Sequence, residues 1–111
     1  MMKYFYIIFF TITLNASDDR ALLFNGNCTT CHFPHETISA PSMADIKKRY
    51  KETFLTREDF VDYMSKWVAK PSRNNSLMLD AIEKYSLMPE LGFEESVLRE
   101  ITSYIYDSKS I

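Results

Sequence analysis

The sequence predicts an all-α domain of four to five helices. Apolar residues recur at the spacing of one helical face in several segments, most clearly in residues 57–69 and 94–107. Segments rich in proline, glycine or small polar residues separate these stretches, and no stretch shows the alternating pattern of a strand. Helices are therefore the only regular elements that we expect.

An export signal is predicted at the N-terminus. Lys3 supplies a positive charge, residues 4–14 are apolar, and Asn15 and Ala16 precede a charged stretch. The apolar run suits a signal peptide and is shorter than the roughly 20 residues that cross a bilayer. We expect residues 1–16 to be removed and residues 17–111 to form one exported domain, with an uncleaved anchor as the alternative. No later run of the sequence is apolar enough to span a membrane.

Two short helices are expected in the first half of this domain. Ser17 is placed to cap a helix over about 18–26, which Gly26 would end. Ser42 can cap a second helix over about 43–50. Both assignments depend on capping chemistry more than on apolar periodicity.

Three more helices are expected in the second half. Thr56 begins a capping box, with aspartate in place of the usual glutamate, ahead of a helix over 57–69. Residues 77–86 form a shorter helix, and residues 94–107 form a terminal helix whose first turn is acidic. Between these two, residues 87–92 contain a proline and a glycine that break helical structure.

The pattern Cys28-Thr29-Thr30-Cys31-His32 predicts covalent haem attachment. Two thiols separated by two residues can each add to a vinyl group of the porphyrin, and the histidine that follows then reaches the iron as proximal ligand. We therefore expect one covalent haem c, held by Cys28, Cys31 and His32. A buried haem would add apolar surface to a domain near the lower size at which a core alone suffices.

Two other chemistries use closely spaced cysteines. A zinc site needs four ligands, and Cys28, Cys31, His32 and His35 crowd into eight residues without the usual second cluster. A thiol–disulfide pair normally follows a strand and opens a helix in an alternating strand and helix pattern, which this sequence lacks. A structural disulfide between these cysteines would close too short a loop to stabilise much. Haem attachment is the favoured interpretation.

Residues 33–42, which contain two prolines, are expected to fold as a loop over one haem face. A ligating imidazole normally donates its second N–H to a carbonyl or carboxylate that fixes its orientation. The Pro41 carbonyl is the candidate acceptor for His32, and the alternative is that Pro41 only shapes the loop ahead of a helix. His35 would lie on the same side of the porphyrin as His32, so we interpret it as a surface histidine.

A methionine is expected as the second axial ligand, since thioether sulfur favours ferrous iron. The exported part contains Met43, Met64, Met78 and Met88. Met43 follows the proximal loop too soon to cross the porphyrin, and apolar helix faces account for Met64 and Met78. Pro89 biases Met88 toward an extended conformation in a loop, so Met88 is the candidate and Met78 the runner-up.

Charge excludes nucleic acid as a partner. Without the signal, 12 basic and 15 acidic side chains remain, a formal net charge of −3, and no basic block is present. One local cluster, formed by Lys47, Lys48, Arg49 and Lys51, is typical of a solvated face. Its alternatives are a docking patch for an acidic redox partner and a source of cations for a haem propionate. Trp67 is expected in the core, with its indole N–H on a backbone carbonyl or on a propionate.

These motifs resemble those of the class I cytochromes c, especially the small exported bacterial ones. The matching parts are Cys28-Thr29-Thr30-Cys31-His32, Ala40-Pro41, Met88-Pro89 ahead of the last helix, and the aromatic Tyr104 in that helix. The resemblance covers nearly all of residues 17–111, although the chain lacks a glycine beside the proline and its methionine loop is short and acidic. It implies a cytochrome c-like fold in which the first and last helices cross, thioether bonds at both cysteines, and axial ligation by histidine and methionine.

The resemblance also implies a monomeric, periplasmic electron carrier and not an enzyme. Such a protein passes single electrons between redox partner proteins as its iron cycles between Fe(III) and Fe(II). The same domain can serve as an accessory subunit of a larger oxidoreductase. Two alternatives stay open, a haem c gas-binding or sensor domain with a weak or open distal site and a thiol–disulfide oxidoreductase that uses the two cysteines.

Overall fold

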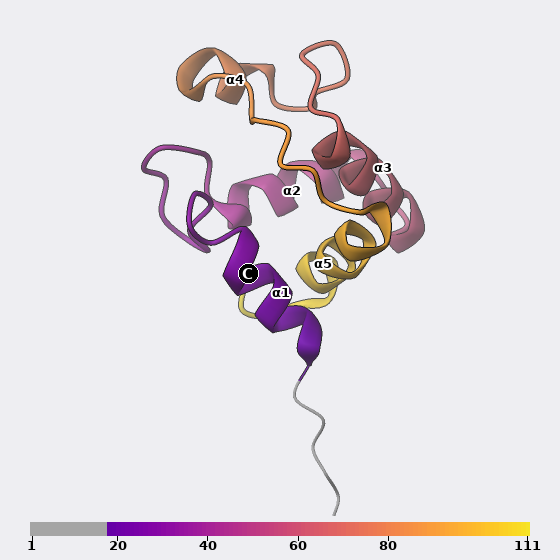
Figure 1. The fold of residues 1–111 in the computed structure, drawn as a ribbon. Coiled ribbons are helices and arrows are strands. Elements are labelled where there is room, and N and C mark those ends of the chain that lie inside the picture. The colour runs from indigo at the N-terminus through magenta and orange to yellow at the C-terminus, as the bar shows by residue number, and fades with distance from the viewer. Residues whose placement is uncertain (1–17) are drawn as a thin grey trace, which may run out of the picture.

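Five helices make up the described part of the chain. The computed structural model describes residues 18–111, so the predicted signal, its cleavage after Ala16 and the capping role of Ser17 lie outside the described residues. The helices are α1 (Asp19–Asn27), α2 (Met43–Thr53), α3 (Arg57–Ala69), α4 (Leu79–Tyr85) and α5 (Glu95–Asp107). Residues 18–111 contain no strand, which confirms the all-α class (Figure 1). None of the five helices is long and apolar enough to cross a bilayer.

Side-chain caps begin the first three helices. Asp18, Ser42 and Thr56 each accept a hydrogen bond from a backbone N–H two or three residues further on, at 3.1 to 3.2 Å. The caps at Ser42 and Thr56 are those that the sequence predicted. The cap of α1 is Asp18, because its carboxylate binds both the N–H and the guanidinium of Arg20.

The end of α1 differs from the prediction. The helix continues through Gly26 to Asn27, and Cys28 is its C-cap, with the Cys28 N–H donating to the Phe24 carbonyl at 2.9 Å. Gly26 is therefore an exposed helical residue and not a helix end. The consequence is that the first cysteine of the motif belongs to the last turn of α1.

Two other boundaries also differ. α2 continues to Thr53, beyond the predicted end near Tyr50. α4 begins at Leu79 and not at residue 77, because the Ser76 hydroxyl accepts from the N–H of Met78 at 2.9 Å and holds the chain in a turn there. Met78 therefore precedes α4 and does not lie on its apolar face.

The helix α5 packs against α3 and α1. It makes the most extensive contact with α3 and a second contact with α1, while α2 packs more lightly on α3 (Figure 1). Phe60 of α3 is fully buried between the rings of Tyr50 and Tyr106, with centroids 5.6 and 5.0 Å away. The core cluster consists of Phe24, Met43, Tyr50, Phe60, Val61, Met64, Ile101 and Ile105.

At the end of α5, Asp107 ties three helices together. Its carboxylate accepts from Arg57 of α3 at 2.8 and 2.9 Å and from Arg20 of α1 at 2.9 Å. These two guanidinium groups, Arg57 foremost, hold the pKa of Asp107 well below its usual range. A carboxylate at a helix C-terminus is unfavourable in the helix dipole, and the two arginines offset that cost.

In Asp107→Asn, we expect the free energy of unfolding to change less as the pH falls into the acidic range. Because the folded-state pKa is lowered, the ionised carboxylate stabilises the fold above the usual aspartate pKa near ~4, and this contribution is lost as the pH falls toward the lowered value. At pH 7 the variant should lose about 1 kcal/mol of unfolding free energy, because the side chain is 35% exposed and its pairs are screened.

Urea unfolding of parent and variant at pH 7 and at pH 2 measures this effect. The difference between the two proteins should be smaller at pH 2 than at pH 7, because pH 2 lies below the usual aspartate pKa and closer to the lowered value. Glu36→Gln, which alters an exposed loop carboxylate, is the matched control and should leave the unfolding free energy unchanged. A difference of the same size at both pH values would show that Asp107 acts without its charge.

Candidate functional site

A tight turn after α1 presents the two cysteines and His32. The N–H groups of Cys31 and His32 both donate to the Cys28 carbonyl, at 3.3 and 2.8 Å, so the motif curls back onto the end of the helix. Cys28 is half-buried and Cys31 is exposed, and both are free thiols. Phe24 positions this turn, since its buried ring packs against Tyr104 of α5 with the centroids 5.4 Å apart.

One backbone carbonyl orients the His32 ring. Its Nδ1 lies 2.9 Å from the Pro41 oxygen, which is the contact expected from the sequence. A carbonyl can only accept, so Nδ1 carries the proton and Nε2 keeps its lone pair. The N–H groups of Met43 and Ala44 donate back to the loop carbonyls of Phe33 and Pro34, at 2.9 and 3.0 Å, and fix this loop against α2.

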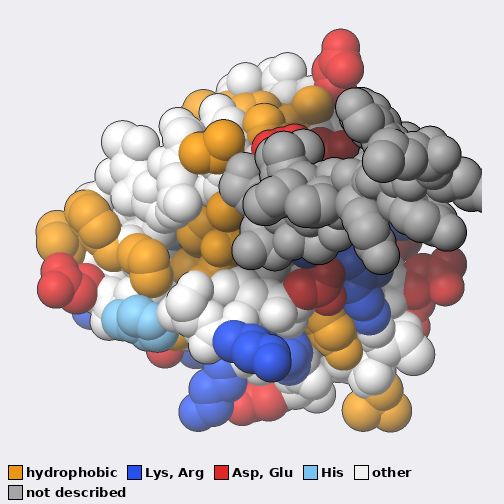
Figure 2. All heavy atoms as spheres, turned by 90° about the horizontal axis from the view of Figure 1, so that it is seen from below, with side chains coloured by type: hydrophobic (Ala, Val, Ile, Leu, Met, Phe, Trp, Pro, Cys, Tyr) orange, Lys and Arg blue, Asp and Glu red, His pale blue; other side chains and the backbone are white. Residues whose placement is uncertain are grey.

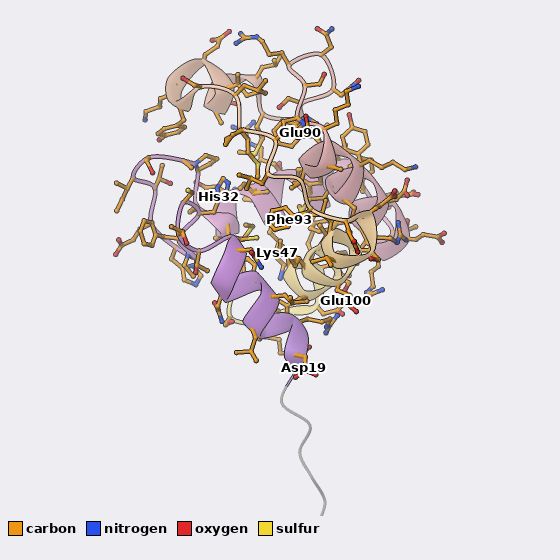
Figure 3. All side chains as sticks on the ribbon, in the orientation of Figure 1. Asp19, His32, Lys47, Glu90, Phe93 and Glu100 are labelled. Carbon is orange, nitrogen blue, oxygen red and sulfur yellow. The ribbon has the colours of Figure 1, made fainter. Side chains whose placement is uncertain are left out.

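A largely apolar cavity lies beside this turn, bounded by α2, α3, α4 and α5. Its volume of about 270 Å³ is near the lower end for ligand pockets, and it is partly open to solvent. It brings Cys28, Cys31 and His32 together with Met88 and Phe93 from the segment between α4 and α5. Figure 3 labels His32 and Phe93 of this lining. Within residues 18–111, none of the lining residues of the cavity is Asp, Glu, Lys or Arg. Sequence reasoning missed Phe93, whose only local signal is its position after the chain-breaking Gly92.

All four methionines of residues 18–111 line this cavity. Met43 and Met64 are buried residues of α2 and α3, as their helical spacing suggested. Met78 is half-buried and stands at the N-cap position of α4. The prediction that it lies on the apolar face of a helix is therefore wrong. Met88 is half-buried in the loop before α5.

The indole N–H of Trp67 is used by the backbone. Trp67 lines the cavity from α3, and its Nε1 donates to the Ser72 carbonyl at 3.0 Å. The backbone carbonyl, one of the two partners considered for this group, accepts its hydrogen bond within the protein. A contact between Trp67 and a haem propionate stays a prediction.

The geometry weighs against a zinc site. His35 is exposed, and its Nε2 lies 2.7 Å from the Ser110 oxygen near the C-terminus. Within residues 18–111, no three or more His, Cys, Asp or Glu side chains gather in an arrangement that could hold a metal ion. Cys28, Cys31, His32 and His35 therefore do not form the four-ligand set that zinc requires.

The basic cluster of α2 is not one exposed face. Lys47 is 8% exposed and its ammonium donates to the Ser108 carbonyl, while Lys51 lies 4.5 Å from the centre of the Tyr106 ring. Lys47 shares the helix face of Met43 and Tyr50, and this spacing was the overlooked signal of its burial. On the face shown in Figure 2, basic side chains lie beside acidic ones and do not form a single patch.

The environment of Cys28 disfavours a thiolate. Burial raises the pKa of its thiol to about 11. The residue is also the C-cap of α1, where the helix dipole opposes negative charge. Attacking thiols of oxidoreductases have lowered pKa values and often lie at helix N-termini, so this cysteine has the opposite surroundings.

Comparison with protein-family models, with curated proteins and with solved structures found no match to this chain. The function is therefore inferred from the residues of the cavity and from their surroundings.

The raised pKa of Cys28 predicts a slow thiol. In the Cys31→Ser chain made without haem, Cys28 should react with iodoacetamide at pH 8 about 100-fold more slowly than in the same chain unfolded in urea. A rise in pKa from 9.0 to about 11 lowers the thiolate fraction by that factor.

Mass spectrometry of timed samples gives both rates. Cys28→Ser is the matched control, because its remaining thiol at Cys31 is exposed and should react at similar rates in the folded and unfolded chain. Equal rates for Cys28 in the two states would contradict the buried environment described for it.

Proposed function

We propose that residues 17–111 form an exported, periplasmic monohaem c domain that carries single electrons between redox partner proteins, in the manner of the class I cytochromes c. One observation carries the proposal. A single charge-free cavity is lined by both cysteines and the histidine of the motif and by a methionine from a loop more than fifty residues away. This is the residue set that covalent haem attachment and histidine–methionine ligation require.

The cysteines would hold the group covalently. Addition of each thiol across a vinyl double bond forms one carbon–sulfur bond and transfers the thiol proton to the other vinyl carbon, so no oxidant or reductant is consumed. The turn that begins at Cys28 sets the spacing of the two sulfur atoms, and α1 fixes that turn against α5. The raised pKa of Cys28 disfavours thiol–disulfide exchange, which needs the thiolate.

His32 and Met88 would be the axial ligands. The hydrogen bond from Nδ1 to Pro41 leaves Nε2 of the neutral ring as the nitrogen that can bind iron, and His32 lines the cavity. Met88 also lines the cavity and comes from a different segment of the chain. When bound, the haem iron supplies one-electron Fe(III)/Fe(II) chemistry, and a thioether ligand favours the ferrous state. The apolar lining limits water around the ligands and leaves one side open to redox partners.

Absorption spectra of protein from cells that mature haem c test the ligands. The protein should carry covalent haem, and its oxidised form should show the weak near-infrared band of methionine bound to ferric iron. Met88→Ala should lose this band, because the iron loses its thioether sulfur. Met78→Ala is the matched control and should keep it, and both variants should keep covalent haem.

The other outcomes are equally specific. Loss of the band in Met78→Ala and not in Met88→Ala would make Met78 the ligand. A c-type spectrum without the band, together with carbon monoxide binding to the reduced protein at neutral pH, would favour a gas-binding sensor. Protein that carries no covalent haem would contradict the proposed function.

A further inference from the structure

A second, charged cleft adjoins the candidate haem cavity. It lies between α2 and α4 and has a volume of about 400 Å³. Pro41, Met78, Ala81 and Tyr85 line both spaces, so the two spaces adjoin at these residues. The charge-free cavity and the charged cleft are therefore immediate neighbours.

The cleft has three cations and three carboxylates among its lining residues, namely Lys48, Arg49, Lys84, Asp45, Glu52 and Asp80. Arg49 is paired with Asp80, with one contact at 3.2 Å, and the Lys48 ammonium lies 4.0 Å from Glu52. Lys84 has no carboxylate partner within residues 18–111. Its ammonium lies 5.3 Å from the ring centre of Tyr85, which borders both spaces.

We propose that this cleft receives the carboxylate edge of the haem, with Lys84 as the principal cation for a propionate. The inference rests on the proposed function. A haem joins an apolar macrocycle to two ionised propionates, and an unpaired carboxylate is costly to bury in a cavity that has no charged lining. The propionates must therefore point away from that lining. Lys84 is the cation of the described cleft lining that lacks a carboxylate partner, and it lies against Tyr85, which borders both spaces.

Reduction potentials of the holoprotein test the site by sign. Lys84→Gln removes a positive charge that opposes ferric iron, so its midpoint should fall relative to the parent. Asp80→Asn removes a negative charge from the same cleft and frees Arg49, so its midpoint should rise. Lys84→Arg should keep the parent midpoint. Lys109→Gln is the charge-matched control, because Lys109 is exposed and lines neither space.

The pH dependence of the midpoint separates contact with a propionate from a general effect of charge. The midpoint potential falls as a propionate ionises. A neighbouring ammonium favours the ionised propionate, so the fall occurs at a lower pH. In Lys84→Gln the fall should move to higher pH by about one unit. The other charges around the cleft, Asp45, Lys48, Arg49, Glu52 and Asp80, are unchanged in this variant, so the shift reports Lys84 alone.

The inference would be overturned if Lys84→Gln matched Lys109→Gln both in its midpoint potential and in the pH at which that potential falls. It would also be overturned if Lys84→Gln lowered the midpoint potential but left the pH of the fall unchanged. Covalent haem content and helical circular dichroism are measured for every variant, and Lys84→Met replaces Lys84→Gln if the latter does not fold. A parent protein without covalent haem would overturn the proposed function itself. A haem-loaded parent with no effect at Lys84 would overturn only the placement of the propionates.

Discussion

The packing of α1 against α5 is the interaction on which the site depends. Phe24 and Tyr104 pack ring to ring between the two helices, and Arg20 of α1 reaches Asp107 at the end of α5. Because Cys28 is the C-cap of α1, the turn that carries both thiols and the histidine moves only with this helix pair. The loop with Met88 leads directly into α5. One helix contact therefore fixes both sides of the cavity.

A polar group in the wall of the cavity is paired within the protein. Thr102 of α5 lines the cavity, and its hydroxyl oxygen lies 2.8 Å from that of Ser65 of α3, with both residues buried. Among the described residues, no buried side-chain nitrogen or oxygen lacks a hydrogen-bond partner. A lining of this kind favours a flat apolar ligand and leaves charges to be accommodated at the rim. The charge-free cavity and the charged cleft beside it follow from the same constraint.

Local chemistry made part of the structure predictable. The Thr56 cap and the hydrogen bond from His32 to Pro41 lie within a few residues in sequence, so pattern and spacing indicated them. The position of Met78 was wrong because the Ser76 hydroxyl, and not apolar spacing, decides where α4 begins. The pairing of Asp107 with two arginines joins residues 50 and 87 positions apart, and no sequence pattern announces a contact of that range.

The structure changes the reason for preferring Met88 to Met78, since neither residue lies within a helix. The Met78 carbonyl accepts from the N–H groups of Ala81 and Ile82, at 3.0 and 3.2 Å, so Met78 is part of the first turn of α4 and moves with it. The Met88 backbone makes no hydrogen bond within the described residues. It follows Ser86, whose φ of 74° turns the chain out of α4, and it precedes Pro89. Met88 can therefore adjust toward an iron without displacing a helix.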